Sequence, residues 1–102
     1  MKPENLIKQL KTKTPPIVVD VRTRFEYQNG HIPGALNLPV ATLLFHRGKL
    51  PESKDSLLVI TCEHGPRAVL ANGMLGLLGF KNCLLLDGHM HSYRKKNLPL
   101  EK

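Results

Sequence analysis

Residues 57–67 read Leu-Leu-Val-Ile-Thr-Cys-Glu-His-Gly-Pro-Arg, an apolar run that passes through a cysteine into a glycine and a proline. The run predicts a short buried strand, and the apolar residues that follow predict a helix over 67–78. Cys62 therefore stands at a strand-to-helix turn. Backbone amides and the positive end of the helix dipole favour an anion at such a turn, and a thiolate is one. The stretch indicates a nucleophilic cysteine.

Similar short apolar runs recur on both sides of this stretch. They predict strands over residues 17–21, 35–38, 57–61 and 83–86. Helices are expected near the N-terminus, over 40–45, over 67–78 and over 90–95, with 46–48 and 50–53 as turn and loop. Strands that alternate with helices imply parallel pairing in a three-layer α/β/α domain with a four- or five-stranded sheet. The loops after Val21, Thr61 and Leu86 should then meet at the carboxyl edge.

The helix expected over 67–78 should bury an apolar stripe on the sheet. This stripe is Leu70, Met74, Leu77 and Leu78, with Ala71 and Leu75 beside it. Gly73 and Gly76 are costly in a helix interior, which suggests close packing on the sheet. Gly79 is expected to end the helix.

Length and composition limit the possible functions. The 102 residues, of which 41% are hydrophobic, suit one globular domain over residues 1–102. No apolar run approaches the ~20 residues of a membrane span, and the polar N-terminus does not resemble a secretory signal, so a cytoplasmic protein is expected. The net charge of +7 is spread along the chain. It favours small anions or acidic partners, and we expect neither nucleic acid nor membrane as a partner.

The two cysteines, Cys62 and Cys83, are not expected to pair. One follows the end of a predicted strand and the other begins a strand, which separates them by roughly 13 to 17 Å in a parallel sheet. Cys83 is predicted to be a small buried apolar residue.

The loop around Cys62 has the parts of an anion-binding site. Arg67 is a cation at the start of the predicted helix, where the positive end of the helix dipole disfavours it. Its presence there is explained if its side chain faces an anion. Gly65 permits a positive φ, and Pro66 contributes no amide. With Cys62 as the catalytic residue, the expected anion-binding residues are Glu63, His64, Gly65, Pro66, Arg67 and Ala68.

Several segments form a recognisable series along the chain: residues 19–22, Glu26, residues 30–35, the Cys-x-x-Gly-x-Arg loop at 62–67, residues 86–88 and Leu98-Pro99. Together they resemble a single-domain rhodanese, a sulfurtransferase of the rhodanese/Cdc25-phosphatase superfamily. The resemblance covers nearly the whole chain. It implies that Cys62 takes sulfane sulfur from thiosulfate, a polysulfide or a persulfide and passes it, as a persulfide, to cyanide or a thiol. No metal or organic cofactor is implied. The implied partners are a small anionic sulfur donor and a thiol or protein acceptor, for a monomer or weak homodimer.

Loop length separates sulfur transfer from dephosphorylation within this superfamily. Phosphatases place five residues between the cysteine and the arginine, whereas four lie between Cys62 and Arg67. The shorter loop suits sulfur. Residues around the loop are expected to support it from behind. They are Asp20, Arg22, Glu26, His31, Gly88 and His89.

A few residues differ from the usual family pattern, and some residues near the loop bear on which sulfur donor the protein uses. His89 stands where the family usually has glycine and Tyr93 where it has tryptophan. With His64 and His91, His89 is expected to form a titrating cluster at the mouth of the site. Cys-x-His and His-x-His are weak metal-binding patterns, so no metal site is predicted. The charge of Glu63 should disfavour thiosulfate and favour a persulfide donor.

Two other classes of function are open from the sequence. One is a noncatalytic rhodanese-like binding or regulatory module, whose basic surface would recruit an acidic partner. The other is a thiol redox or phosphatase-like enzyme. The cysteine and arginine in the loop argue against the first. The lack of a resolving cysteine and the loop length argue against the second.

Overall fold

Four short strands form one parallel sheet in the computed structural model, which describes residues 1–102. The strand order is β2-β1-β3-β4, so the connection from β2 to β3 passes over β1. The strands are β1 (Ile17–Asp20), β2 (Leu36–Asn37), β3 (Leu57–Thr61) and β4 (Asn82–Leu85). The helices are α1 (Pro3–Leu10), α2 (Arg24–Gln28), the 3-10 segment η1 (Val40–Lys49), α3 (Pro66–Leu77) and α4 (His89–Lys95).

Strand β3 lies in the interior of the sheet and explains the unbroken apolar run of the sequence. It pairs with β1 through Ile17↔Leu58 and with β4 through Leu58↔Cys83. Successive side chains of a strand point to opposite faces, and here both faces are covered. Residues Leu58 to Thr61 are therefore all buried.

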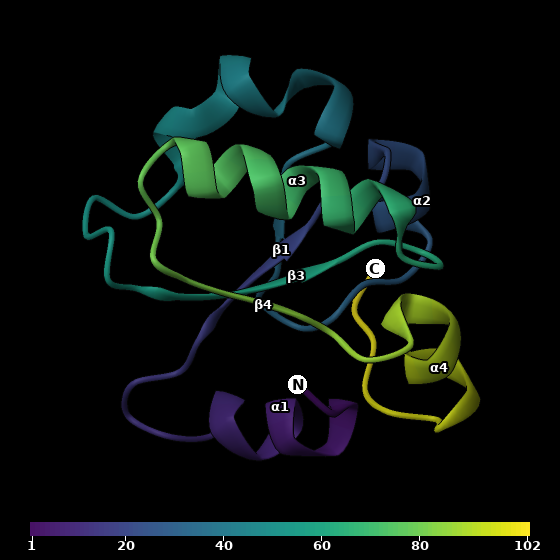
Figure 1. Ribbon diagram of the computed structural model, residues 1–102. Coiled ribbons are helices and arrows are strands. Elements are labelled where there is room, and N and C mark those ends of the chain that lie inside the picture. The colour runs from purple at the N-terminus through teal and green to yellow at the C-terminus, as the bar shows by residue number, and fades with distance from the viewer.

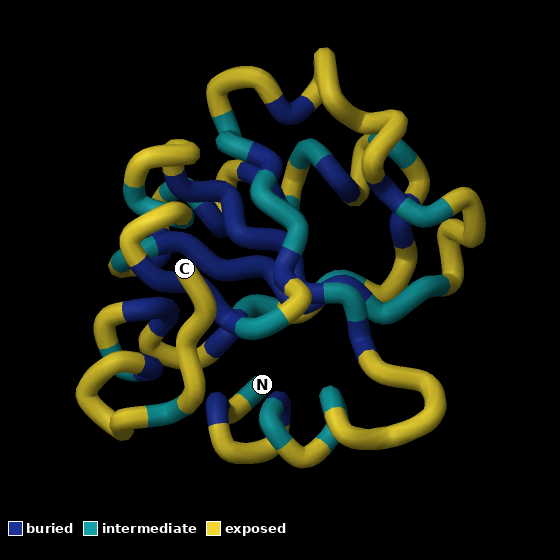
Figure 2. The backbone as a smooth tube through the Cα atoms, turned by 180° about the vertical axis from the view of Figure 1, so that it is seen from behind, coloured by how far each residue is buried: buried dark blue, intermediate teal, exposed yellow.

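The helices form one layer on each face of the sheet (Figure 1). Helix α3 and η1 cover one face, where Leu43 and Leu75 pack against Val19 and Ile60. Helices α1 and α4 cover the other, where the core includes Leu6, Val59 and Tyr93. In Figure 2 the buried backbone forms a central band, and exposed segments surround it. The predicted α/β/α architecture is confirmed, with four strands.

Two segments differ from the elements expected from sequence. Helix α2 was not predicted, although Thr23 and Glu26 form a capping box in which each side chain binds the other's backbone amide. The segment expected as a turn at residues 46–48 continues as η1, which contains a kink at His46 (φ −117°, ψ 18°). None of the helices is both long and apolar enough to cross a bilayer.

The predicted buried face of α3 is partly wrong. The helix buries Ala68, Ala71 and Leu75, whereas Leu70 and Leu77 are exposed. The two alanines lie against the sheet because small side chains allow the helix to approach it closely. The inner face of α3 thus carries two alanines and Leu75, with Met74 and Leu78 of the predicted stripe partly buried beside them.

The two helical glycines of α3 do not serve close packing either. A Cβ atom built at Gly73 or Gly76 would meet no other heavy atom within 4 Å. We expect Gly73→Ala and Gly76→Ala each to raise the free energy of unfolding by about 0.5 to 1 kcal/mol, because alanine loses less backbone entropy in a helix. Urea unfolding measures the change.

Gly79 provides the matched control for these two substitutions. It follows the end of α3 with φ +100°, as expected for a residue that ends a helix. Gly79→Ala should lower the free energy of unfolding because alanine is strained in this conformation. A gain at Gly79, or losses at Gly73 and Gly76, would contradict this description of α3.

Candidate active site

The Cys62 loop lies at the carboxyl edge of the sheet, between β3 and α3. The loops after β1 and β4 meet it there, as predicted. Val21 donates its backbone N–H to the carbonyl of Thr61 at 2.9 Å. On the other side, the backbone N–H groups of Met90 and His91 in α4 donate to the carbonyls of Cys62 and Glu63, at 3.0 and 3.2 Å. The first turn of α4 therefore holds the backbone of the loop.

The loop turns back on the sulfur of Cys62. The N–H of Gly65 donates to Sγ of Cys62 at 2.9 Å. Gly65 has φ +127°, which only glycine adopts without strain, and Pro66 starts the helix directly after it. Four further amides of the loop donate to no acceptor in the protein: those of Glu63, His64, Arg67 and Ala68. The loop therefore offers N–H groups to an anion, with the helix dipole behind them.

The side chain of Cys62 is almost completely buried, at 1% exposed. It forms part of the core cluster between the sheet and α3. The sulfur therefore lies at the base of the loop. The largest cavity, about 600 Å³, lies at the opposite edge of the sheet, lined by residues such as Pro15, Ile17 and Pro33. That cavity has no part in the chemistry of Cys62.

His89 lies beneath the loop, not at its mouth. It is 7% exposed and adopts φ +52°, an uncommon value for a residue other than glycine. Its Nδ1 accepts a long hydrogen bond, 3.4 Å, from the N–H of Cys62. A Cβ atom at Gly65 would lie 3.2 Å from its Nε2, so the ring packs directly against the glycine. Burial lowers the pKa of His89, which favours the neutral ring.

The other two histidines of the predicted cluster behave differently. His64 and His91 are exposed, and their ring centroids lie 4.9 Å apart. The expected cluster of three is therefore a surface pair with a separate buried histidine.

Arg67 faces an anion, but this anion is a side chain of the protein. Its two terminal nitrogens donate to the two carboxylate oxygens of Glu26 in α2, at 2.7 and 2.9 Å. The pair ties α2 to the first turn of α3 and lowers the pKa of Glu26 to about 2. Glu26 thus contacts the loop through Arg67, while its supporting role in the site and contact of Arg67 with a donor both stay predictions.

This ion pair makes stability depend on pH. The pKa of Glu26 lies below its usual value of 4.5, so its contribution is complete above about pH 4.5 and is lost as the pH falls toward 2. We expect Glu26→Gln, which keeps the capping geometry, to cost about 1 to 2 kcal/mol at pH 7, a figure that allows for solvent screening. This cost should shrink toward pH 2.5. Urea unfolding across this range measures it, and a cost independent of pH would contradict the pairing.

Asp20 and Arg22 form a buried ion pair behind the loop. The guanidinium donates to both carboxylate oxygens, with a shortest distance of 2.7 Å, and to the carbonyl of Gly30 at 2.8 Å. Both side chains are at most 3% exposed. Arg22 also reaches Oε1 of Glu63 at 3.6 Å, and Arg94 pairs with Oε2. Two arginines thus offset the negative charge of Glu63. This charge should therefore repel thiosulfate less than the sequence alone suggested.

The remaining predicted supporting residues, His31 and Gly88, make contacts outside the Cys62 loop. His31 stacks on Tyr27 and lies 3.7 Å from the carboxylate of Glu101, so it joins α2 to the C-terminal segment. Gly88 adopts φ +71° and begins α4, where a Cβ atom would collide with Ser92. The sequence did not predict the contact of Arg94 with Glu63, because no motif or spacing in the sequence links these two residues.

Cys62 and Cys83 are both free thiols, as predicted. Cys83 is half-buried on β4 and packs against the same core cluster, and burial raises its pKa. A raised pKa keeps Cys83 protonated and unreactive.

Comparisons with known proteins show which proteins this chain resembles in sequence and fold. A family model described as the rhodanese-like domain matches residues 2–96. A sulfurtransferase from Allochromatium vinosum is 31% identical over 97 residues, which cover 95% of this chain and 89% of that protein. A rhodanese-related protein from Thermoplasma volcanium superposes with a TM-score of 0.84 at 27% identity and covers 99% of this chain and 95% of its own.

A longer relative contains a similar segment within a larger protein. The adenylyltransferase and sulfurtransferase uba4 of Ogataea parapolymorpha is 28% identical over 97 residues, or 92% of this chain. The chain spans 25% of the length of that protein.

Proposed function

The chain belongs to the rhodanese-like domain family, and from this premise we propose that it is a sulfurtransferase that carries sulfane sulfur on Cys62. The observation that supports this most is the loop around the sulfur. One amide already contacts Sγ at 2.9 Å, and four more have no acceptor in the protein. Amides in this arrangement stabilise negative charge on the thiolate and on a persulfide formed from it.

The reaction proceeds in two displacements on sulfur. The Cys62 thiolate attacks the outer sulfur of a donor such as thiosulfate, the S–S bond of the donor breaks, and sulfite leaves with the bonding electron pair. Cyanide or an acceptor thiolate then attacks the terminal sulfur of the persulfide, and Cys62 leaves as a thiolate. No net oxidation or proton uptake is needed, and the covalent intermediate divides the transfer into two steps.

Burial of the thiol restricts the donor. Cys62 is 1% exposed, so the reacting sulfur has to be a slim terminal atom that enters between the loop side chains. Thiosulfate, polysulfides and low-molecular-weight persulfides all end in such an atom. Arg94, which is 41% exposed, pairs with Glu63, and Arg22 is paired with Asp20, so the charges beside the loop balance. The net charge of +7 on the whole chain favours an anionic donor over a neutral one.

Formation of thiocyanate from cyanide tests the proposal. The protein is supplied with thiosulfate, with polysulfide or with cysteine persulfide, and thiocyanate is measured for each donor. We expect turnover with at least one donor and none with a phosphate monoester. Phosphatase activity without thiocyanate formation would overturn the assignment, and so would the absence of both, which would indicate a binding module.

A further inference from the structure

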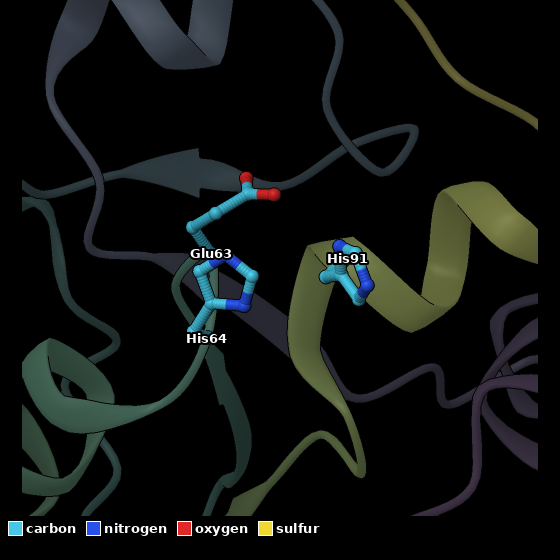
Figure 3. A group of neighbouring side chains, drawn as sticks. All are labelled: Glu63, His64 and His91. Carbon is cyan, nitrogen blue, oxygen red and sulfur yellow. The ribbon is translucent and has the colours of Figure 1, made fainter.

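Two exposed histidines and a glutamate gather at the rim of the Cys62 loop. Glu63 and His64 extend from the loop itself, and His91 extends from the first turn of α4 (Figure 3). One ligand atom from each residue lies within 4.8 Å of the other two. None of the three makes the catalytic contact with Sγ, so the sulfur chemistry does not account for this gathering.

A backbone hydrogen bond holds the loop and α4, which carry these three side chains, next to each other. The N–H of His91 donates to the carbonyl of Glu63 at 3.2 Å, which fixes the start of α4 against the loop. The two imidazole rings lie 4.9 Å apart and are tilted by 40°. Ligands of a tetrahedral zinc ion lie roughly 3.3 Å from one another, given bonds of about 2.0 Å. The ligand atoms lie within 4.8 Å of one another, so they need to approach by at most about 1.5 Å, which changes in the torsion angles of these surface side chains can provide.

The neighbouring charges limit which atom of Glu63 is available. Its Oε2 pairs closely with Arg94, while Oε1 lies 3.6 Å from Arg22. Arg22 has stronger partners in Asp20 and the carbonyl of Gly30. Oε1 is therefore the oxygen that can turn to a cation while Oε2 keeps its arginine.

We propose that Glu63, His64 and His91 bind a zinc-class divalent ion that joins the Cys62 loop to α4 and slows sulfur transfer. Two imidazoles and one carboxylate are a ligand set that zinc, cobalt and nickel accept, with further positions open to water. The sequence alone did not predict this site, because His64 and His91 are 27 residues apart and neither adjacent pattern is specific. The effect on rate rests on the proposed function, whereas the binding does not.

The inhibition follows from the burial of Cys62. A donor reaches the sulfur only when side chains of the loop move aside, since the thiol is 1% exposed. A metal ion bound to Glu63 and His64, the two residues after Cys62, would tie them to His91. The loop then opens less readily.

Binding is tested by calorimetry with Zn²⁺ and by the visible spectrum of Co²⁺, on untagged protein at about pH 7.5, because protons compete with metal ions for ligand atoms at lower pH. A Cys62→Ser, Cys83→Ser background removes both thiols as ligands. In this background we expect one ion per chain. His91→Ala and His64→Ala should each weaken binding at least tenfold, while His46→Ala, at an exposed histidine in η1, should leave it unchanged. Equal binding in all three variants, or no binding in the background, would overturn the site.

The effect on rate is tested with both thiols present. His91→Ala keeps the backbone N–H that contacts Glu63, so its rate without metal should equal that of the native protein. Added Zn²⁺ should slow the native protein and His46→Ala alike, and His91→Ala should need at least tenfold more for the same inhibition. Equal inhibition of all three would show that the ion acts on Cys62 directly and would overturn the regulatory part. If no sulfur transfer occurs at all, the binding measurements still decide the site.

Discussion

Cys62→Ser is expected to lower kcat/KM for thiocyanate formation by at least about a thousandfold. Covalent catalysis needs a sulfur nucleophile here, because a serine oxygen neither ionises near neutral pH nor forms a persulfide. The substitution changes one buried atom in the loop, and the N–H of Gly65 retains an acceptor on residue 62. The loss should therefore be in chemistry, with little change in the free energy of unfolding. Steady-state kinetics with the best donor measures it.

Cys83→Ser is the matched control for this substitution. Cys83 lies half-buried on β4, and burial raises the pKa of its thiol. We expect kcat/KM within about twofold of the native value, because no step of the proposed reaction uses this thiol. A comparable loss in Cys83→Ser, or full activity in Cys62→Ser, would remove Cys62 from its proposed role.

Arg22→Leu is expected to cost about 3 to 5 kcal/mol of the free energy of unfolding, the largest loss of stability among these substitutions. The carboxylate of Asp20 is 1% exposed and accepts all of its side-chain hydrogen bonds from Arg22. Without the guanidinium, the buried carboxylate keeps only the backbone N–H of residue 22 as a donor and has no opposite charge beside it, and the carbonyl of Gly30 loses a donor. Thermal and urea unfolding measure the loss, which for a domain of 102 residues is a large share of the total.

Two companion variants separate this effect from the loss of any arginine. Arg94→Leu removes a partly exposed partner of Glu63 and should cost less than about 1 kcal/mol. Asp20→Leu combined with Arg22→Leu removes both buried charges and should recover part of the single-variant loss. A loss below about 1 kcal/mol for Arg22→Leu alone would contradict the structural role of the pair.

The sheet and the site edge were predictable because the strand and loop signals are local. The apolar run over 57–61 predicts a buried strand. Gly65 and Pro66, which follow it, predict a turn and the start of a helix. Parallel pairing then brings the loops after three strands together at one edge of the sheet, and this holds regardless of where the helices begin, end or pack. Cys62 was found by its place in this arrangement.

The partners of the charged residues were not predictable in the same way. Arg67 binds Glu26 across 41 positions of the chain, from a helix that sequence periodicity did not reveal because α2 has only five residues. The face of α3 was misjudged because large apolar residues outnumber alanines in its sequence. The sequence predicted that His89 lies at the mouth of the site, whereas the structure places it beneath Gly65. Its backbone has a positive φ, and the sequence gives no sign of such a φ at a residue other than glycine.

The mass of the protein after exposure to a sulfur donor tests the central claim most directly. The native protein is incubated with thiosulfate, polysulfide or cysteine persulfide, desalted and analysed by mass spectrometry, intact and as peptides. We expect the peptide that contains Cys62 to gain the mass of one sulfur atom, and cyanide to remove this sulfur with release of thiocyanate. An unmodified Cys62 with every donor, or added sulfur on Cys83 alone, would contradict it.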